Sequence, residues 1–226
     1  MIAVVCPRIW ESATRLAEIV DSCPTTLVTV DTDLVSVILL TGGSSRRMGC
    51  DKASLQFGDD TLLAYHLKQI PSEFPVVVVG ESVDTWSEVT RTLEDPPGAG
   101  PVAAISSGLE HVITPDVLIL AVDTPFALPK LLRLELSPNS HALIPRDPSG
   151  KAQFLAGLYR SDSLRHALRQ LGAPDNKSMR ELTSHLPSID YHHLSPETAQ
   201  DFMDLDTPED LATARALLVS HPKVMP

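Results

Sequence analysis

Apolar residues along this chain gather into short, nearly unbroken runs separated by stretches with helical spacing. Three runs are long and strongly apolar: 35–40, 75–79 and 117–122. Strands covered by helices on both faces have this continuous pattern, whereas strands with one wet face alternate between apolar and polar residues. We therefore expect these three runs to be buried parallel strands.

The segments between the runs predict helices, further strands and turns. Each expected helix has a residue suited to its first turn or cap: Thr61 for a helix to about Ile70, Pro101 for one to about His111, Ser161 for 161–171, and Thr207 or Asp206 for the last helix at Pro208. Shorter strands are expected at 92–95 and 141–145. Alternating strands and helices predict an α/β fold of three layers with a mainly parallel mixed sheet.

Residues 1–34 precede the first buried run and form an N-terminal extension of uncertain role. Their pattern predicts strands at 2–6 and 25–30 around an amphipathic helix. An appended β-α-β element packed on the main sheet is favoured, and an association arm or an early translation start remains open. We assign the main domain to 35–218 and a C-terminal tail to 219–226.

A glycine-rich, cationic loop follows the first run. Its sequence is Leu40-Thr41-Gly42-Gly43-Ser44-Ser45-Arg46-Arg47-Met48-Gly49-Cys50-Asp51-Lys52. Glycines permit a tight turn whose backbone N–H groups form a concave anion site, and Arg47 and Lys52 add positive charge. The spacing fits neither the Walker loop nor the dinucleotide fingerprint. The loop nevertheless predicts a polyphosphate site.

Carboxylates and a second glycine-rich loop extend this candidate site. Asp123 follows the third run, where open α/β sheets bind ligands, and its hard oxygens suit Mg2+ beside a polyphosphate. Gly100 precedes a helix N-terminus that offers N–H donors to a ligand. Alternation places Asp204 and Asp206 on one face of an extended segment, and either is a candidate to join Asp123 around the ion.

Composition narrows the ligand class. The 226-residue chain is 43% hydrophobic and 21% charged, as expected for a globular protein, with 4% aromatic residues and a net charge of −11. Few aromatics and an acidic balance oppose nucleic-acid and anionic-membrane binding. One nucleotide can still bind an acidic protein through a local basic loop and Mg2+. Three scattered cysteines, no signal-peptide pattern and no run of membrane-spanning length lead us to expect a cytoplasmic protein.

The glycine-rich loop resembles the signature of molybdenum cofactor guanylyltransferases, Leu-Ala-Gly-Gly-x-Ser-x-Arg-Met-Gly-x-Asp-Lys, and departs from it only at Thr41. Other segments resemble the same family: 100–104 its Gly-Pro-Leu-Ala-Gly, 123–125 its Asp-Thr-Pro, 153–159 its Gln/His-Pro-Leu-x-Ala-Leu-Tyr, and 204–211 its C-terminal Asn/Asp-x-Asn/Asp-Thr-Pro-Glu-Asp-Leu. Phe154 replaces the usual proline. The resemblance covers 35–218 and implies a Rossmann-like nucleotidyltransferase fold of the sugar-nucleotide-transferase-like superfamily.

The resemblance implies a reaction in which GMP passes from GTP to molybdenum-molybdopterin, pyrophosphate leaves, and molybdopterin guanine dinucleotide forms. It also implies Mg2+ as cofactor and transient contacts with other molybdenum cofactor proteins. Carried over by position, it assigns catalysis to Arg47, Lys52 and Asp123; nucleotide binding to Leu40, Thr41, Gly42, Gly43, Lys52, Asp95, Gly100 and Asp123; the metal to Asp123; and the acceptor to Gln153, Lys177, Arg180 and Asp206.

Two alternatives remain open. A molybdopterin cytidylyltransferase, or another small-molecule nucleotidyltransferase, would share the fold and the site, because base choice depends on a few contacts. Gly43, Asp51-Lys52 and Gly100-Pro101 favour guanine. A non-catalytic GTP-binding subunit belongs to a different class, and the presence together of Arg47, Lys52 and Asp123 argues against it.

Overall fold

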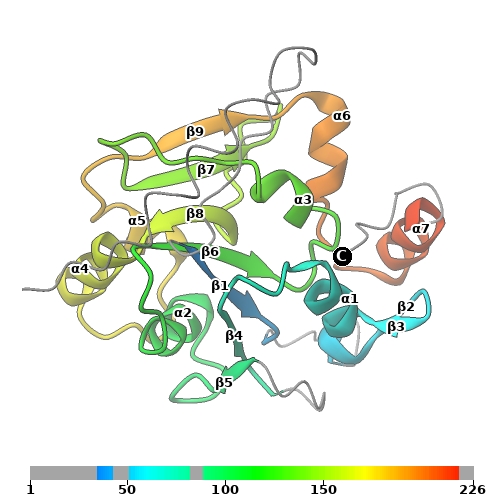
Figure 1. The fold of residues 1–226 in the computed structure, drawn as a ribbon, viewed down its shortest axis with the longest axis horizontal. Helices are drawn as coiled ribbons and strands as arrows, with labels where there is room; N and C mark the ends of the chain where they lie inside the picture. The colour runs from blue at the N-terminus through cyan, green and yellow to red at the C-terminus, as the bar shows by residue number, and fades with distance from the viewer. Residues whose placement is uncertain (1–34, 43–50, 82–88, 219–226) are drawn as a thin grey trace, which may run out of the picture.

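A seven-stranded sheet in the order β5-β4-β1-β6-β8-β7-β9 forms the centre of the computed structural model, which describes residues 35–42, 51–81 and 89–218 (Figure 1). The strands are β1 (Val35–Leu40), β4 (Val76–Val79), β5 (Thr90–Thr92), β6 (Asp116–Ala121), β7 (Ala142–Arg146), β8 (Ala156–Arg160) and β9 (Asp190–His193). Every neighbouring pair is parallel except those of β8, which runs antiparallel to β6 and β7. The expected mainly parallel mixed sheet is confirmed.

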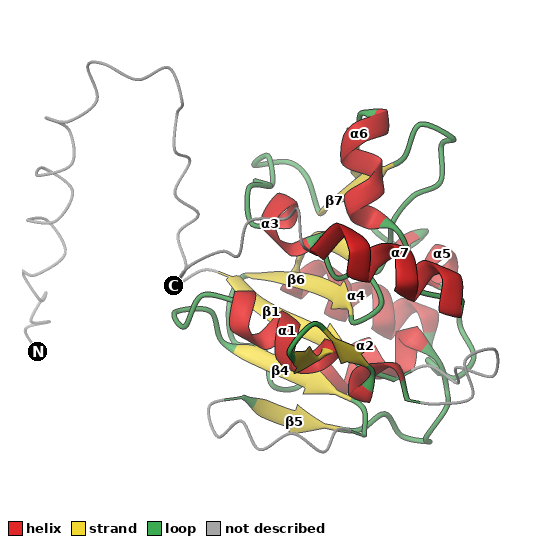
Figure 2. Cartoon of the chain, turned by 90° about the vertical axis from the view of Figure 1, so that its right-hand side faces the viewer, coloured by secondary structure: helices red, strands yellow, loops and turns green. Residues whose placement is uncertain are grey.

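Helices cover both faces of the sheet (Figures 1 and 2). One face packs against α1 (Leu62–Gln69), α3 (Leu128–Leu131) and α7 (Pro208–Leu218), and the other against α2 (Pro101–Leu109), α4 (Ser161–Leu171) and α5 (Met179–Thr183). Side chains of β1 alternate between the two cores, with Leu39 in the first and Ile38 in the second. Each buried strand is therefore apolar on both faces, which explains the unbroken apolar runs.

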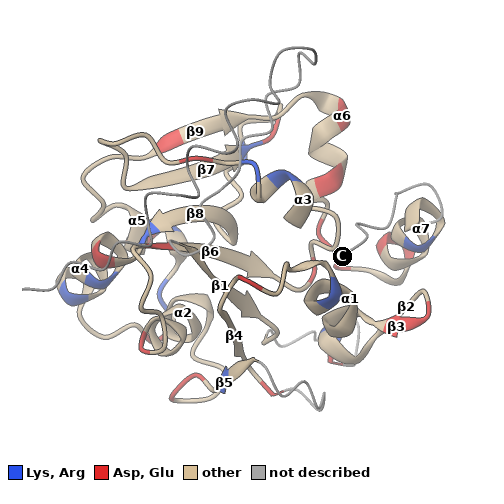
Figure 3. Ribbon diagram, in the orientation of Figure 1, with Lys and Arg blue, Asp and Glu red and all other residues tan. Residues whose placement is uncertain are grey.

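Short elements complete the chain: the hairpin β2 (Gln56–Phe57) and β3 (Asp60–Thr61), the helix α6 (Pro196–Ala199), and the 3-10 turns η2 (Lys52–Ser54) and η3 (Gln200–Phe202). No helix in the described ranges has the length and apolar character needed to cross a membrane. Acidic side chains are distributed over several elements, including β9, α6 and α7, rather than concentrated on one of them (Figure 3).

The three long strands and their helices match the sequence expectations. Thr61 caps α1, since its Oγ1 accepts a hydrogen bond from the Ala64 amide at 3.1 Å. Thr207 and Asp210 cap α7 reciprocally: Thr207 Oγ1 accepts from the Asp210 amide at 3.1 Å, and Asp210 Oδ2 from the Thr207 amide at 2.9 Å. Side-chain capping of this kind satisfies N–H groups that the first helical turn leaves unpaired.

Two local predictions are wrong. Ser161 does not cap α4: it lies inside the first turn, and its hydroxyl is fully buried without a hydrogen-bond partner among the described residues. Its amide instead donates to the Pro115 carbonyl at 2.8 Å. The strand expected at 92–95 is β5 (Thr90–Thr92), an edge strand whose polar residues carry no apolar signal. The strands and helix expected in 1–34 lie outside the described residues, and the division into extension, domain and tail stays a prediction.

The carboxyl ends of β4, β1 and β6 lie side by side at one edge of the sheet. Gly80, just after β4, has a φ of 128°, and a Cβ there would overlap Thr41 Oγ1 and lie 2.8 Å from the Gly42 amide nitrogen. The loop that begins at Thr41 can therefore pack against the end of β4 only because residue 80 is glycine. Asp123 leaves β6 at this same edge.

Candidate active site

A lysine held between two carboxylates lies at this edge of the sheet. Lys52 Nζ donates to Asp123 Oδ2 at 3.0 Å and to Asp206 Oδ1 at 2.8 Å. Lys52 ends the glycine-rich loop, Asp123 follows β6, and Asp206 lies in the segment that precedes α7. The fold thus brings together three residues that the sequence assigned to catalysis, metal and substrate.

Lys52 is positioned by the 3-10 turn η2. Asp51 caps this turn, because its Oδ1 accepts a hydrogen bond from the Ala53 amide at 3.1 Å. Ala53 is 3% exposed and belongs to the core next to α1. Anchoring Ala53 fixes the backbone of its neighbour, so that the Lys52 side chain extends toward β6.

Asp123 is positioned by hydrogen bonds on both sides of its peptide. The Val122 amide donates to the Leu40 carbonyl at 2.9 Å, which continues the sheet for one residue beyond β6. The Asp123 carbonyl accepts from the Leu205 amide at 2.9 Å. This bond draws the segment before α7 against the end of β6 and explains why Asp206 reaches Lys52.

Burial and charge shift the pKa values of this cluster. The Lys52 and Asp123 side chains are 14% and 26% exposed. Burial raises the pKa of the Asp123 carboxyl above its ordinary value; the positive charge of Lys52 opposes the rise, and the negative charges of Asp204 and Asp206 add to it. Burial lowers the pKa of the Lys52 ammonium, but bonds and charges from Asp206 and Asp123 outweigh burial, and the net shift is upward. Lys52 therefore stays charged at neutral pH.

The two carboxylates fit a divalent cation in their chemistry. Asp123 and Asp206 already hold one positive group between hard oxygens, the ligand type that Mg2+ prefers. Among the described residues, no group of three or more His, Cys, Asp or Glu would hold an ion alone. Since Mg2+ commonly binds through one or two carboxylates together with substrate phosphates, an ion here would share its coordination with a ligand.

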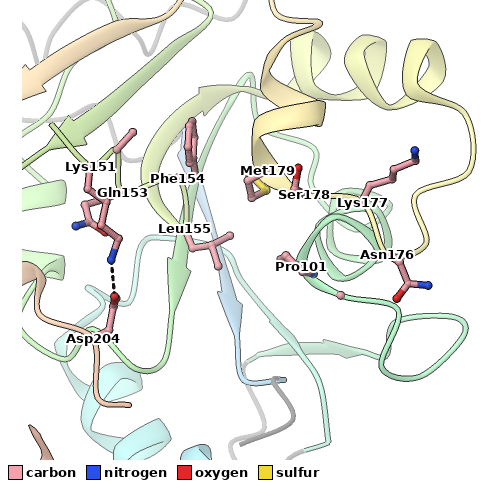
Figure 4. A pocket seen from close by; sticks show the side chains of 12 residues that line it. Pro101, Lys151, Gln153, Phe154, Leu155, Asn176, Lys177, Ser178, Met179 and Asp204 are labelled. Carbon is pink, nitrogen blue, oxygen red and sulfur yellow. Dashed lines mark hydrogen bonds and ion pairs between the residues drawn. The ribbon is translucent and has the colours of Figure 1, made fainter. Parts of the chain in front are cut away.

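A cavity of about 580 Å³ (Figure 4) borders this cluster through Asp204, whose charge acts on Asp123. It is lined by Gly100, Pro101, Lys151, Ala152, Gln153, Phe154, Leu155, Asn176, Lys177, Ser178, Met179 and Asp204. Pro101, Phe154, Leu155 and Met179 give it apolar walls, and Lys151 and Asp204 form an ion pair of 2.8 Å at one end. The volume suits a small organic molecule with an apolar body and a charged group.

Hydrogen bonds between loops fix the walls of the cavity. The backbone N–H of Asn176 donates to the Ala99 carbonyl at 2.7 Å, which connects the loop before α5 to the loop before α2. Ser178 and Glu181 form a reciprocal capping box at the start of α5. The Tyr159 hydroxyl donates to the Phe154 carbonyl at 2.6 Å, so the backbone at the replaced proline is held by the adjacent strand.

Four further residues predicted to bind the nucleotide lie in different places. Leu40 and Thr41 use backbone groups within the sheet: the Leu40 carbonyl accepts from Val122, and the Thr41 amide donates to the Val79 carbonyl at 2.9 Å. The Thr41 hydroxyl also donates to Val79, at 3.1 Å, which accommodates the departure from the family's alanine. Gly42 is exposed at the edge, and Gly100 lines the cavity with a φ of 97°.

The remaining predicted residues are dispersed. Asp95 is exposed and does not line the cavity. Gln153 and Lys177 line it, whereas Arg180 is exposed on α5 outside the lining. Gly43 and Arg47 lie outside the described residues. The sequence analysis did not identify Lys151 as a site residue. Its position could have indicated a role, because Lys151 is a basic residue at the end of a turn, two residues before Gln153, where the segment that resembles the family begins.

His66 on α1 supports the end of β6 from the core. Its ring is fully buried, and Nε2 lies 2.9 Å from the Val122 carbonyl oxygen, to which it donates. Nδ1 has no hydrogen-bond partner among the described residues. Burial lowers the pKa of His66 to about 4, although the bond to Val122 opposes this shift. The imidazole is therefore neutral at physiological pH.

We expect the free energy of unfolding to fall as the pH drops from about 6.5 toward 4, because in this range His66 is protonated in the unfolded chain and neutral in the native state. At about pH 5 this group alone would remove roughly 2 kcal/mol. Urea unfolding at about pH 7.5 and 5 measures the effect. His66→Gln, which keeps a donor but does not titrate in this range, should lose this part of the pH dependence. An identical dependence in the variant would contradict the assignment.

Comparison with known proteins identifies the family. Residues 37–192 match the model of the MobA-like NTP transferase domain. The chain belongs to this family. It is 32% identical over 199 residues to a probable molybdenum cofactor guanylyltransferase of Chloroflexus aggregans, covering 82% of this chain and 95% of that protein. It is 34% identical over 157 residues to a protein of the same name from Mycolicibacterium paratuberculosis, covering 64% and 78%.

Solved structures support the fold. Molybdopterin-guanine dinucleotide biosynthesis protein A from Archaeoglobus fulgidus superposes with a TM-score of 0.63 at 22% identity, covering 82% of this chain and 100% of that one. The 2-C-methyl-D-erythritol 4-phosphate cytidylyltransferase of Thermus thermophilus superposes at 0.60 and 21% identity, covering 81% and 98%. The Rossmann-like nucleotidyltransferase fold and the family resemblance are confirmed. This member of the MobA-like family is an enzyme, a nucleotidyltransferase.

Proposed function

We propose that this enzyme transfers GMP from GTP to molybdenum-molybdopterin, releasing pyrophosphate and forming the guanine dinucleotide cofactor, in the cytoplasm. The observation that carries the proposal is the junction between the ionic cluster and the cavity. Asp206 pairs with Lys52 of the glycine-rich loop, and Asp204, two residues earlier, pairs with Lys151 of the cavity lining. One short segment therefore borders both a polyphosphate site and a site for a second substrate.

The chemistry is an in-line displacement at phosphorus. An oxygen of the acceptor's terminal phosphate forms a bond to the α-phosphorus of GTP, and the bond from that phosphorus to the bridging oxygen of pyrophosphate breaks. The electron pair of the broken bond stays on pyrophosphate, where negative charge grows. A preorganised cation lowers the barrier most when it lies at this growing charge.

Lys52 is the described cation suited to that task. In the absence of nucleotide its ammonium is held by Asp123 and Asp206, and phosphate oxygens would replace these carboxylates as its partners. Asp123, with Asp206 beside it, would then hold Mg2+, whose charge stabilises the polyphosphate. Arg47 remains a predicted contact of the phosphates, and Gly43 and the exposed residue Gly42 remain predicted contacts of the nucleotide.

The cavity would receive the acceptor. Apolar side chains of Phe154 and Met179 suit the faces of a flat heterocycle such as a pterin. Gln153, Asn176 and Ser178 offer donors and acceptors for its polar edges. Gly100, at the border of this cavity, and Asp95 in the preceding loop remain the predicted nucleoside contacts.

The test is pyrophosphate release by the purified protein with molybdenum-molybdopterin, Mg2+ and either GTP or CTP, with the dinucleotide product identified by mass spectrometry. We expect turnover with GTP and none with CTP. Chelating the metal should abolish the turnover with GTP. Turnover with CTP alone would overturn the guanine assignment and support a cytidylyltransferase. Tight GTP binding without release of pyrophosphate would support a binding subunit and contradict the proposal.

A further inference from the structure

We propose that Lys151 binds the attacking phosphate of the acceptor, exchanging its present partner Asp204 for a phosphate oxygen. This inference rests on the proposed function, because it assigns one end of the cavity to the phosphate and the other to the heterocycle.

Lys151 lies where the cavity borders the ionic cluster. It lines the cavity, and its Nζ donates to Asp204 Oδ2 at 2.8 Å (Figure 4). Asp204 is two residues before Asp206, which holds Lys52 at 2.8 Å. The Lys151 end of the cavity therefore meets the cluster in which the α-phosphorus must lie. An acceptor phosphate has to sit at this end, because attack requires its oxygen to be about 3–3.5 Å from phosphorus.

The local backbone holds Lys151 in place while leaving its ammonium free to exchange. The Lys151 amide donates to Asp147 Oδ1 at 3.0 Å, and its carbonyl accepts from the Asp147 amide at 3.0 Å. Ser149 Oγ donates to the same carboxylate oxygen at 2.6 Å. The side chain itself is 59% exposed, so replacing one anionic partner by another requires only rotation of flexible methylenes.

The other cations near the cavity are less suited to this role. Lys177 also lines it but is paired with Glu181 of α5 at 3.2 Å, and it lies at the opposite end in Figure 4. The Arg146 guanidinium stacks on the Tyr191 ring at 3.6 Å from its centre. Arg180 does not line the cavity. Among the described lining residues, Lys151 is the lysine that adjoins the ionic cluster.

Charge balance gives the expected size of the effect. Without Lys151, the Asp204 carboxylate would lose the cation that pairs with it, and its repulsion of an incoming phosphate would add to the lost hydrogen bond. Charge-assisted hydrogen bonds contribute enough to change affinity by about ten- to hundredfold. The loss should appear in binding of the phosphorylated acceptor and not in binding of GTP.

The experiment compares Lys151→Met and Lys151→Arg with Lys130→Met, a matched control whose surface lysine pairs with Asp201 at 3.4 Å outside the cavity. Calorimetry measures binding of 6-hydroxymethylpterin phosphate, of unphosphorylated 6-hydroxymethylpterin and of GTP to each full-length protein. Steady-state kinetics give KM for molybdenum-molybdopterin. Circular dichroism confirms that each variant is folded.

We expect Lys151→Met to weaken binding of the phosphorylated pterin by about tenfold or more. The KM for the acceptor should rise by a similar factor. Binding of the unphosphorylated pterin and of GTP should stay within about twofold, Lys151→Arg should recover most of the loss, and Lys130→Met should match the wild type. Unchanged affinity of Lys151→Met for the phosphorylated pterin would overturn the proposal. So would the same loss in Lys177→Met instead, because it would place the phosphate at the opposite end.

Measuring both pterin binding and GMP transfer distinguishes failure of the phosphate site from failure of the proposed reaction. If the wild-type enzyme binds the phosphorylated pterin through Lys151 but transfers no GMP, the phosphate site stands and the proposed reaction fails. If it transfers GMP with an acceptor KM that does not respond to Lys151→Met, the reaction stands and the inference fails.

Discussion

Asp123→Asn is expected to lower kcat for nucleotidyl transfer by about a thousandfold, or roughly 4 kcal/mol of activation free energy, in a protein that remains folded. Asparagine preserves the shape of the side chain and one oxygen, but it removes the charge that would attract a divalent cation to the phosphates. Burial already raises the pKa of this carboxyl, so its ionised form is not a source of net stability. The neutral variant should therefore lose activity and not its melting temperature.

Pyrophosphate release under saturating substrates measures the loss, and Mn2+ binding followed by electron paramagnetic resonance measures the metal affinity. Asp116→Asn is the matched control, since Asp116 begins the same strand and pairs with Arg160 at 2.8 Å at the opposite end of β6. This control should leave the kcat of the folded enzyme near that of the wild type. A folded Asp123→Asn enzyme within tenfold of the wild-type kcat would falsify the assignment of Asp123 to the reaction.

The sequence predicted the strands with the longest apolar runs, although it did not predict β8 (Ala156–Arg160), which is also buried. The runs 35–40 and 117–122 became β1 and β6, because strands covered on both faces are apolar at nearly every position. The edge strands β5 and β9 and the two-residue strands of the β2–β3 hairpin were placed wrongly or not anticipated. Their residues are short and polar, and neighbouring strands rather than their own sequence determine their pairing.

The residues of the site could be predicted from the sequence in part, but their contacts could not. Lys52 and Asp123 were predicted because each follows a strand that ends at the ligand-binding edge. Their ion pair was not, since it depends on how far η2 carries the lysine toward β6. Alternation placed Asp204 and Asp206 on one face but gave no partner for either. The pairing of Asp204 with Lys151 arises from the turn before β8, 53 residues away in the chain, and could be found only in three dimensions.

Lys52→Met is expected to lower kcat by about a hundred- to a thousandfold while strengthening the binding of a divalent cation in the absence of nucleotide. The first effect follows from loss of the charge that would stabilise pyrophosphate as it departs. The second follows from the present geometry: the ammonium occupies the space between Asp123 and Asp206, and a cation must displace it. Methionine keeps most of the side-chain volume and removes the ammonium from between the two carboxylates.

Pyrophosphate release gives the change in kcat, and Mn2+ titration of the nucleotide-free enzyme gives the metal Kd. Because the lysine no longer competes for Asp123 and Asp206, Mg2+ should also raise the melting temperature of Lys52→Met more than that of the wild type. Lys68→Met, which breaks the ion pair between Lys68 of α1 and Asp60 of β3, controls for the loss of a surface lysine and should change neither quantity. Weaker Mn2+ binding by folded Lys52→Met would contradict competition between the lysine and the metal. A retained kcat would exclude Lys52 as the group that stabilises the leaving pyrophosphate.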